Sequence, residues 1–367
     1  KTAYEIRNCD WSSDVCSSDL SLYIIDLSTV LAGPSVATFF AELGAEVVKI
    51  ENTNQPDVTR SWRIPGEQQE ISSYFSSINY CKTYVQKDLM DSKDKLWIES
   101  QITKADILIM NFKPKDYVKF NLTKKILHEL NPRLIVGSIS GFGDESDRVA
   151  YDLILQAETG FMAINGEEDS NPLKMPIALI DVLAAHHLKE AILIALLNRF
   201  KTGKGSWVSV SLYDAAVSSL VNQAAAFLMN GILPKQQGSL HPNIAPYGEI
   251  FQTNDDKHVT FAIGSDNQFI KLCEILQCPT VSSDIRFDSN VNRVKNRRVL
   301  QGILKPFIEK FNSDDLVKSM NLNYIPMGVI KNLDDVFKNP ETEKMIKTEK
   351  ISNTITKRIS QIAFKWK

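Results

Sequence analysis

Residues 21–51, SLYIIDLSTVLAGPSVATFFAELGAEVVKIE, carry the clearest pattern of secondary structure in the chain. A short apolar strand at 23–27 runs into a Gly-Pro turn, an amphipathic helix at 35–45 closes at Gly44, and a second strand follows at 46–51. A helix between two strands is the usual crossover connection of a parallel pair. The stretch therefore predicts two parallel strands in one sheet.

Two later apolar runs extend this sheet. ADILIMNF at 105–112 and RLIVGSISGFG at 133–143 indicate further strands, with a helix near 124–130 between them. The first half thus predicts a doubly wound, mostly parallel, Rossmann-like α/β domain. In such sheets ligands bind at the carboxyl ends of the strands, which here carry LAGP, NFKP and SGFG.

The second half predicts a smaller α+β domain. A long helix at 182–198, an alternating strand at 207–214 and a helix at 214–227 precede a hairpin at 249–264. We expect the large domain to span residues 21–225 and to be completed by about 325–367. The small domain and its linkers then occupy 226–324, and the segment 344–367 is only weakly patterned.

The N-terminal segment resembles a sequencing artefact, and a natural polar arm is the alternative interpretation. DWSSDVCSSDL at 10–20 matches the in-frame translation of a common sequencing adapter. We therefore expect residues 1–20 to be an artefactual, disordered N-terminus that conceals the true start, and exclude them from the fold.

Composition narrows the class of protein. The 367 residues carry a formal net charge of −2, are 43% hydrophobic and 23% charged, and contain no apolar run of ~18 residues. We therefore expect neither a nucleic-acid binder nor a membrane protein. Beyond the N-terminal segment three scattered cysteines remain, Cys81, Cys273 and Cys278, which predicts a reducing, cytoplasmic environment.

Several common catalytic motifs are missing from the sequence. It contains no GxxxxGK[ST] loop, no HExxH and no GxSxG. His186 and His187 are adjacent on a predicted helix, where neighbours point to different faces, so we expect no metal site.

Asp181 is the most unusual residue of the chain. It lies within the apolar stretch MPIALIDVLAAHH at 175–187, where a charge without a partner is costly. Two interpretations are open from position alone: Asp181 is the N-cap of a helix that begins at Val182, or it is a nucleophile.

Five segments in order resemble the class III CoA-transferase family (CaiB/BaiF), which includes formyl-CoA transferase and carnitine CoA-transferase. They are residues 24–51, NFKP, ELNPRLIVGSISGFG, YDLILQAETGFMAINGE and NRFKTGKGSWVSVSLYDA. The family's catalytic aspartate matches Asp181, which favours the nucleophile. Its CoA contacts match Leu31, Ala32, Lys87, Asp88, Leu89, Met90, Asn111, Phe112, Lys113, Lys119, Ser140, Gly141, Phe142 and Gly143.

The resemblance implies that CoA moves from an acyl-CoA to a carboxylic acid through aspartyl anhydride and aspartyl-CoA thioester intermediates. Coenzyme A is then substrate and product, with no permanently bound cofactor. We expect an interlinked homodimer and, from the likeness of HPNIAPYG to dicarboxylate-type members, a substrate such as succinate. Asn52 and Thr83 replace arginines common in the family, which leaves part of the adenosine-phosphate contact open.

Two alternatives share this fold. An α-methylacyl-CoA racemase would use a histidine that aligns with Tyr151, and a phenol is a poor base near neutral pH. A non-catalytic CoA-binding protein would not need an aspartate in the apolar setting of Asp181.

Overall fold

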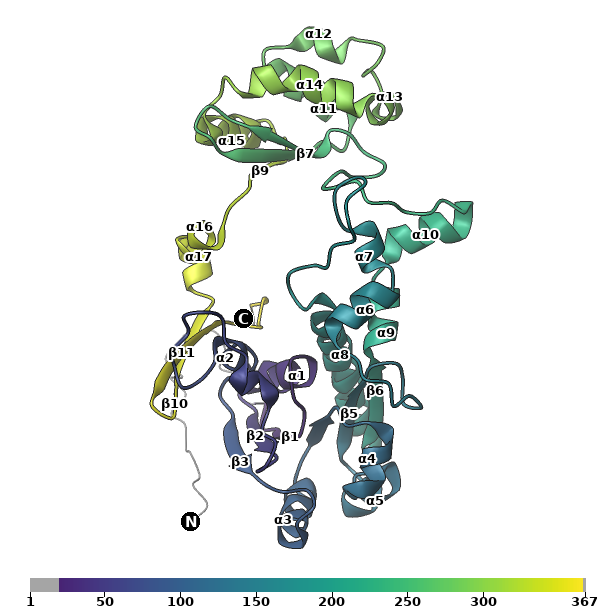
Figure 1. Ribbon diagram of the computed structural model, residues 1–367, viewed down its shortest axis with the longest axis vertical. Coiled ribbons are helices and arrows are strands. Elements are labelled where there is room, and N and C mark those ends of the chain that lie inside the picture. Colours follow the sequence, from purple (N-terminus) through teal and green to yellow (C-terminus); the bar gives the residue numbers. More distant parts are fainter. Residues whose placement is uncertain (1–19, 366–367) are drawn as a thin grey trace. The chain divides into compact units, whose positions relative to one another are not determined.

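A computed structural model describes residues 20–365 of the chain, so the adapter-like residues 1–19 lie outside the described part (Figure 1). The chain forms two compact units. Among the described residues, the large unit comprises 20–162, Lys174–Pro234 and 344–365, and the small unit comprises Ala163–Leu173 and Lys235–Glu343. The expected boundary at 225–226 therefore lies nine residues before the end of the middle segment, inside a helix of the large unit.

The large unit is built on a six-stranded sheet. Its strands are β1 (Tyr23–Asp26), β2 (Glu46–Glu51), β3 (Thr83–Gln86), β4 (Ile107–Met110), β5 (Ile135–Ser140) and β6 (Ser206–Ser211). Its helices are α1 (Ala32–Glu42), α2 (Ser73–Ile78), α3 (Ser92–Ile102), α4 (Pro114–Lys119), α5 (Lys124–Leu130), α6 (Asp152–Glu158), α8 (Leu179–Thr202), α9 (Leu212–Ser218) and α10 (Val221–Asn230), with a 3₁₀ helix at Val58–Ser61. The short α7 (Phe161–Ile164) lies where the chain passes to the small unit.

The sheet order is β3-β2-β1-β4-β5-β6, and all paired strands are parallel. Successive residues of a strand point to opposite faces, and here both faces are apolar. Ile24 packs into the core with α1 and α8, whereas the next residue, Ile25, packs into the core with α3 and α5. The expected doubly wound α/β architecture is confirmed (Figure 1).

The strand order reverses between β1 and β4, because β2 and β3 continue to one side and β5 and β6 to the other. Ligands of doubly wound sheets bind in the crevice at such a switch point, outside the carboxyl ends of the strands. The connections that leave β1 and β4 at this edge are residues 27–31 and 111–113.

The small unit surrounds its own core. Its antiparallel sheet has the order β7 (Tyr247–Gln252), β8 (His258–Ala262), β9 (Met327–Val329). Phe251, Phe261 and Leu304 pack into one apolar cluster with residues of its helices. These helices are α11 (Asp266–Ile275), α12 (Pro279–Ser282), α13 (Asn290–Lys295), α14 (Arg297–Ile308), α15 (Ser313–Leu322), α16 (Leu333–Phe337) and α17 (Pro340–Glu343).

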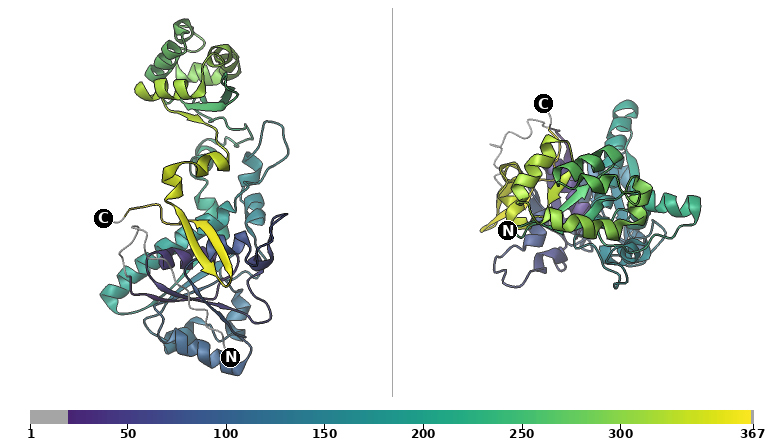
Figure 2. Two further views of the ribbon diagram at one scale, coloured as in Figure 1. Left: turned by 90° about the vertical axis from the view of Figure 1, so that its left-hand side faces the viewer. Right: turned by 90° about the horizontal axis from the view of Figure 1, so that it is seen from above.

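A C-terminal hairpin, which the weak pattern at 344–367 did not predict, completes the large unit. Strands β10 (Ile346–Ile351) and β11 (Thr354–Ile359) pair antiparallel, and Figure 2 shows them in yellow against the N-terminal elements. Ile351 packs against Phe75 and Tyr84, and the backbone N–H of Gln361 donates to Glu42 at 3.0 Å. The contacts of this segment come from the N-terminal part of the chain, with the Gln361–Glu42 contact spanning 319 positions, and local patterning does not reveal them.

Two further expectations about helices were wrong in detail. The long helix begins at Leu179 rather than Val182, and the single helix expected at 214–227 is broken at Ser219 and Leu220 into α9 and α10. No helix within residues 20–365 has the length and apolar character needed to cross a membrane.

Candidate active site

A cavity of about 310 Å³ lies at the carboxyl-terminal edge of the sheet in the large unit, and Asp181 lines it. The connections after β1, β4 and β5 form most of its wall, together with the start of α8 and α9. The lining residues are Thr29, Val30, Leu31, Ala32, Asn111, Phe112, Lys113, Pro114, Ile139, Ser140, Gly141, Ser146, Arg148, Val149, Ala150, Tyr151, Asp181 and Leu212. This is the position that the sheet topology predicts for a ligand.

Asp181 is not the N-cap of its helix. Helix α8 begins at Leu179, so Asp181 is its third residue, and the capping position is Ala178, whose side chain accepts no hydrogen bond. The cap comes from another helix instead: Asp152 of α6 accepts the backbone N–H of Ile180 at 2.7 Å. A free N–H of the first turn is thereby satisfied by a carboxylate from another helix, and Asp181 does not serve as the cap.

Gln156, also on α6, fixes the segment that leads into α8. Its Oε1 accepts the backbone N–H of Met175 at 2.7 Å, and its Nε2 donates to Asp152 at 2.6 Å. Asp152 and Gln156 thus hold both the approach to α8 and its first turn. The sequence YDLILQAE carries these two residues four positions apart, on one face of α6.

The electrostatic setting of Asp181 is unusual for a carboxylate. Its side chain is only 8% exposed, and within residues 20–365 no group donates a hydrogen bond to it. Burial, and secondarily the negative charge of Asp152, raise the pKa of Asp181 to about 7. A carboxylate of this kind is a better nucleophile than one with an ordinary pKa, and a large fraction of it is still ionised at neutral pH.

The connection from β1 to α1 brings backbone close to the cavity. The first turn of α1 has no side-chain cap, and Leu31 and Ala32 at its start line the cavity. Gly33 follows them, and a Cβ at this position would lie 2.3 Å from the Cβ of Ser28. Only glycine permits this turn to fold back so tightly after β1.

The structure brings seven of the predicted CoA contacts into the cavity with Asp181. They are Leu31, Ala32, Asn111, Phe112, Lys113, Ser140 and Gly141. A Cβ at Gly141 would meet the Cβ of Ala150 at 2.3 Å, so glycine allows the two cavity-lining loops to touch here.

The other seven predicted contacts lie outside the cavity. The Lys87 ammonium pairs with Asp94 at 2.8 Å, Leu89 is buried in the core, and Met90 is exposed. These residues and Asp88 follow β3, the edge strand farthest from β5. Phe142 packs against Tyr213, Gly143 has a φ of +95° in the following turn, and Lys119 lies at the end of α4.

Arg148 and Tyr151 line the cavity although the sequence did not single them out as binding residues. The Arg148 guanidinium lies 3.8 Å from the centre of the Phe142 ring and pairs with Glu158 at 2.7 Å. The signal was present: Arg148 is a cation in the polar loop that follows the predicted strand at 133–143, just ahead of the YDL motif.

Tyr74 of α2 is a second residue that the sequence did not indicate. Burial, followed by the charges of Asp181 and Asp152, raises the pKa of Tyr74 to about 12, so its phenol lies within electrostatic reach of both carboxylates. No group of three or more His, Cys, Asp or Glu side chains in the described part of the chain could hold a metal ion.

Comparison with known proteins gives the family. Residues 21–367 match CoA-transferase family III. The chain is 33% identical over 328 residues to the succinate–glutarate CoA-transferase of Agrobacterium fabrum, which covers 87% of this chain and 82% of that protein. It is 31% identical to the human succinyl-CoA:glutarate CoA-transferase, over 87% of this chain and 73% of that one.

A solved structure has the same fold over nearly the whole length. The CaiB/BaiF family protein from Brucella suis superposes with a TM-score of 0.80 at 32% identity and covers 96% of this chain and 93% of its own. The sheet, the position of the cavity and the sequence match agree with one another, and the chain belongs to CoA-transferase family III.

Proposed function

We propose that this CoA-transferase uses Asp181 as its covalent nucleophile, and that it exchanges CoA between succinyl-CoA and a second dicarboxylic acid. The observation that carries the proposal is the setting of Asp181: a buried carboxylate without a hydrogen-bond donor, facing a cavity at the switch point of the sheet. A purely structural aspartate in such a place would be expected to have a partner.

The steps balance without ATP or a metal. The Asp181 carboxylate attacks the acyl carbon of the donor thioester, which gives a mixed anhydride and releases the CoA thiolate. The thiolate attacks the aspartyl carbonyl, which gives an aspartyl-CoA thioester and frees the donor acid. The acceptor carboxylate then displaces the thiolate from the aspartyl carbonyl, and the thiolate attacks the acceptor acyl carbon of the new anhydride, which regenerates Asp181.

The surroundings of the cavity support an anionic substrate. Lys113 and Arg148 line the same cavity as Asp181 and bring positive charge to it. The named activities of both relatives, succinate–glutarate and succinyl-CoA:glutarate transfer, concern dicarboxylates. The backbone at the start of α1 and the loop at 140–141 suit the amide groups of pantetheine, because they offer N–H donors close to the cavity.

CoA is a long molecule, and we propose that its nucleotide end extends from the cavity along the same edge of the sheet. Lys119, Phe142 and Gly143, together with residues 87–90, stay predicted contacts of CoA. We also propose that the enzyme is a homodimer and that it is cytoplasmic.

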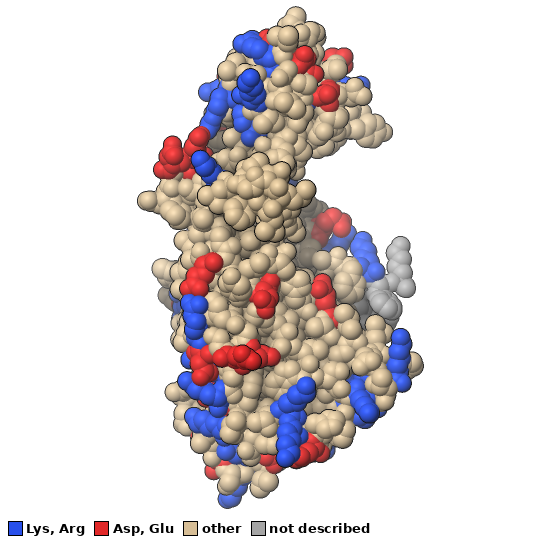
Figure 3. All heavy atoms as spheres, turned by 90° about the vertical axis from the view of Figure 1, so that its right-hand side faces the viewer, with Lys and Arg blue, Asp and Glu red and all other residues tan. Residues whose placement is uncertain are grey.

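The exposed apolar side chains of α8 and of α10 support the homodimer, and we propose that a second copy of the chain covers them. Leu197 and Phe200 of α8 are 67% and 92% exposed, and α10 adds Leu228 and Met229 at 79% and 81%. Figure 3 looks onto the side from which α10 projects, and α10 contains no Lys, Arg, Asp or Glu. Such a surface indicates a protein interface.

Thioester exchange tests the function directly. Purified protein is incubated with succinyl-CoA and a panel of acids that includes glutarate, oxalate, acetate and carnitine, and new thioesters are identified by mass. We expect glutaryl-CoA or another dicarboxylyl-CoA from the wild type and no detectable product from Asp181→Asn. Asp314→Asn, in the first turn of α15 of the small unit, is the matched control and should leave exchange unchanged.

Chemical trapping separates the nucleophile from other roles. Wild type incubated with succinyl-CoA and then hydroxylamine should carry a modification on the peptide MPIALIDVLAAHH. Exchange that persists in Asp181→Asn would refute the covalent role. Incorporation of deuterium at the α-carbon of a 2-methylacyl-CoA, without exchange, would favour the racemase instead.

A further inference from the structure

The loop that follows β1 holds one residue in a costly conformation. Val30 has a φ of +70°, in the left-handed region that β-branched residues rarely adopt. Val30 lines the cavity, as do its neighbours Thr29 and Leu31. A strained residue persists only where its surroundings enforce it, so the contacts of this loop show what fixes the cavity wall.

Side chains from outside the loop form hydrogen bonds with its backbone at Thr29 and Val30. Asn111, after β4, accepts the N–H of Thr29 at 3.1 Å and donates to its carbonyl at 2.9 Å. Asp57, in the connection after β2, accepts the N–H of Val30 through Oδ1 at 3.3 Å. The strained residue and the one before it are therefore held from two different elements.

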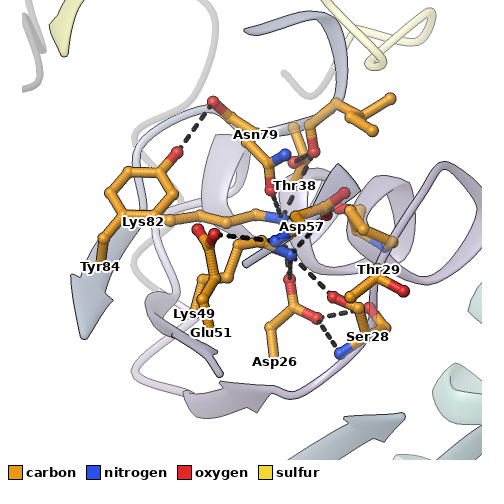
Figure 4. Close-up of polar contacts among 12 residues, drawn as sticks. Asp26, Ser28, Thr29, Thr38, Lys49, Glu51, Asp57, Asn79, Lys82 and Tyr84 are labelled. Carbon is orange, nitrogen blue, oxygen red and sulfur yellow. Dashed lines mark hydrogen bonds and ion pairs between the residues drawn. The ribbon is translucent and has the colours of Figure 1, made fainter. Parts of the chain in front are cut away.

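Two buried lysines donate hydrogen bonds to backbone carbonyls on either side of these residues. The Lys49 ammonium donates to the carbonyl of Ser28 at 2.7 Å, and the Lys82 ammonium donates to the carbonyl of Pro34 at 2.9 Å. Figure 4 shows the two lysine side chains close to Asp26, Ser28 and Asp57; Lys49 comes from β2, and Lys82 immediately precedes β3. The segment 28–34, which contains the cavity wall, is thus fixed at four residues.

The lysines belong to a buried ionic cluster of two cations and two anions. Lys49 lies 3.2 Å from Asp57, and Lys82 lies 2.9 Å from Asp26. All four side chains are at most 1% exposed. Buried ion pairs of this kind add little net stability, because desolvation offsets most of their attraction. Such a cluster instead fixes the orientation of its side chains, because each charged group must face its partner of opposite charge.

We propose that Asp57 and Lys49 are positioning residues, which hold Val30 in its left-handed conformation and thereby keep the wall of the CoA cavity in its binding form. Lys49 acts through Asp57 and through the carbonyl of Ser28, and neither side chain lines the cavity. The inference rests on the proposed function, because it assigns the cavity to the acyl-CoA.

The test asks whether the effect of Asp57 depends on residue 30. Asp57→Ala removes the acceptor of the Val30 N–H, so the loop should relax to a negative φ and bind acyl-CoA less often. Glycine adopts a positive φ without a Cβ clash, so the same substitution in a Val30→Gly background should cost much less. We expect Asp57→Ala to raise the KM for succinyl-CoA about tenfold with valine at position 30 and about twofold or less with glycine.

A matched control separates positioning from general damage. Asp106 pairs with Arg199 at 3.0 Å and accepts the N–H of Tyr23 at 2.9 Å, at the opposite end of the same strands. Asp106→Ala should lower the melting temperature and leave the KM unchanged. An equal rise in KM with valine and with glycine at position 30, or a rise in the control as large as that of Asp57→Ala, would overturn the proposal.

Asp57→Asn covers the case in which the alanine variant does not fold. It keeps the side-chain volume and an oxygen that can cap the 3₁₀ helix at Thr59, as Asp57 does at 3.1 Å. The KM rise should be smaller but should again shrink in the glycine background, and an undiminished rise there counts against the proposal. Wild type that exchanges thioesters without the expected coupling refutes this inference alone, whereas wild type without exchange refutes the proposed function.

Discussion

At the scale of single residues, Asp181 combines two opposing demands. Burial disfavours its charge, whereas the proposed nucleophilic attack requires that charge. The site resolves the conflict only in part, because no donor within the described residues stabilises the ionised carboxylate. Burying the charge therefore costs folding free energy, and in the proposed mechanism the unstabilised carboxylate is the form that attacks the thioester.

The first prediction at this scale concerns stability. The folded pKa of Asp181, about 7, lies above its unfolded value of about 4, so its contribution to stability is complete below pH 4 and is lost as the pH rises to 7. Asp181→Asn should therefore match the wild type near pH 4 and exceed it at pH 8, by up to about 4 kcal/mol. Urea unfolding at both pH values measures this, and a difference independent of pH would contradict it.

At the scale of elements, side chains of helix α6 hold the first turn of helix α8. Asp152 caps the first turn of α8 and also adds negative charge near Asp181. These two roles can be separated, because asparagine keeps a cap acceptor and removes the charge.

We expect Asp152→Asn to lower the pKa of Asp181 and so to move the acid limb of the kcat/KM profile for succinyl-CoA to lower pH. The shift should be modest, because burial is the larger cause of the raised pKa. Asp152→Ala should in addition cost about 1 kcal/mol of stability through the lost cap. Profiles measured from pH 5 to 9 decide this, and an unmoved acid limb in Asp152→Asn would show that its charge does not reach Asp181.

The helices and strands show which parts of the fold the sequence can predict. Strand β2 and helix α5 have the predicted bounds, because apolar periodicity and local turn residues determine them. The predicted start of α8 at Val182 was wrong, because the residue that caps this helix is Asp152, which lies 29 positions before Asp181. The β10–β11 hairpin was missed for the same reason, since Ile351 packs against Phe75 and Tyr84.

For the site, the sequence predicted the cavity residues that follow strands. It did not predict the residues that only tertiary contacts bring to the cavity. Leu31, Asn111 and Gly141 come directly after strands or in the connections that leave them, and the resemblance matched them to CoA. Nothing local indicates that Asp57 should hold Val30, or that Tyr74 lies near Asp181.

At the scale of the whole molecule, the exposed apolar faces of α8 and α10 set the last prediction. Side chains as exposed as Phe200 and Leu197 are costly in water, and a second copy of the chain would remove them from it. We expect the wild type to scatter light with twice the mass of one chain. The pair of substitutions Leu197→Glu and Phe200→Glu should shift it toward the monomer, because two carboxylates would be buried in the interface of each chain.

Leu322→Glu is the matched control, since Leu322 of α15 is 74% exposed in the small unit and should leave the mass of the dimer unchanged. The thioester-exchange assay on the same samples connects assembly to activity. A wild type that stays monomeric and fully active down to the lowest measurable concentration would refute the homodimer and leave Asp181 and its cavity as a site complete in one chain. A monomeric Leu197→Glu/Phe200→Glu variant that binds CoA but does not exchange thioesters would show that assembly acts on chemistry rather than on binding.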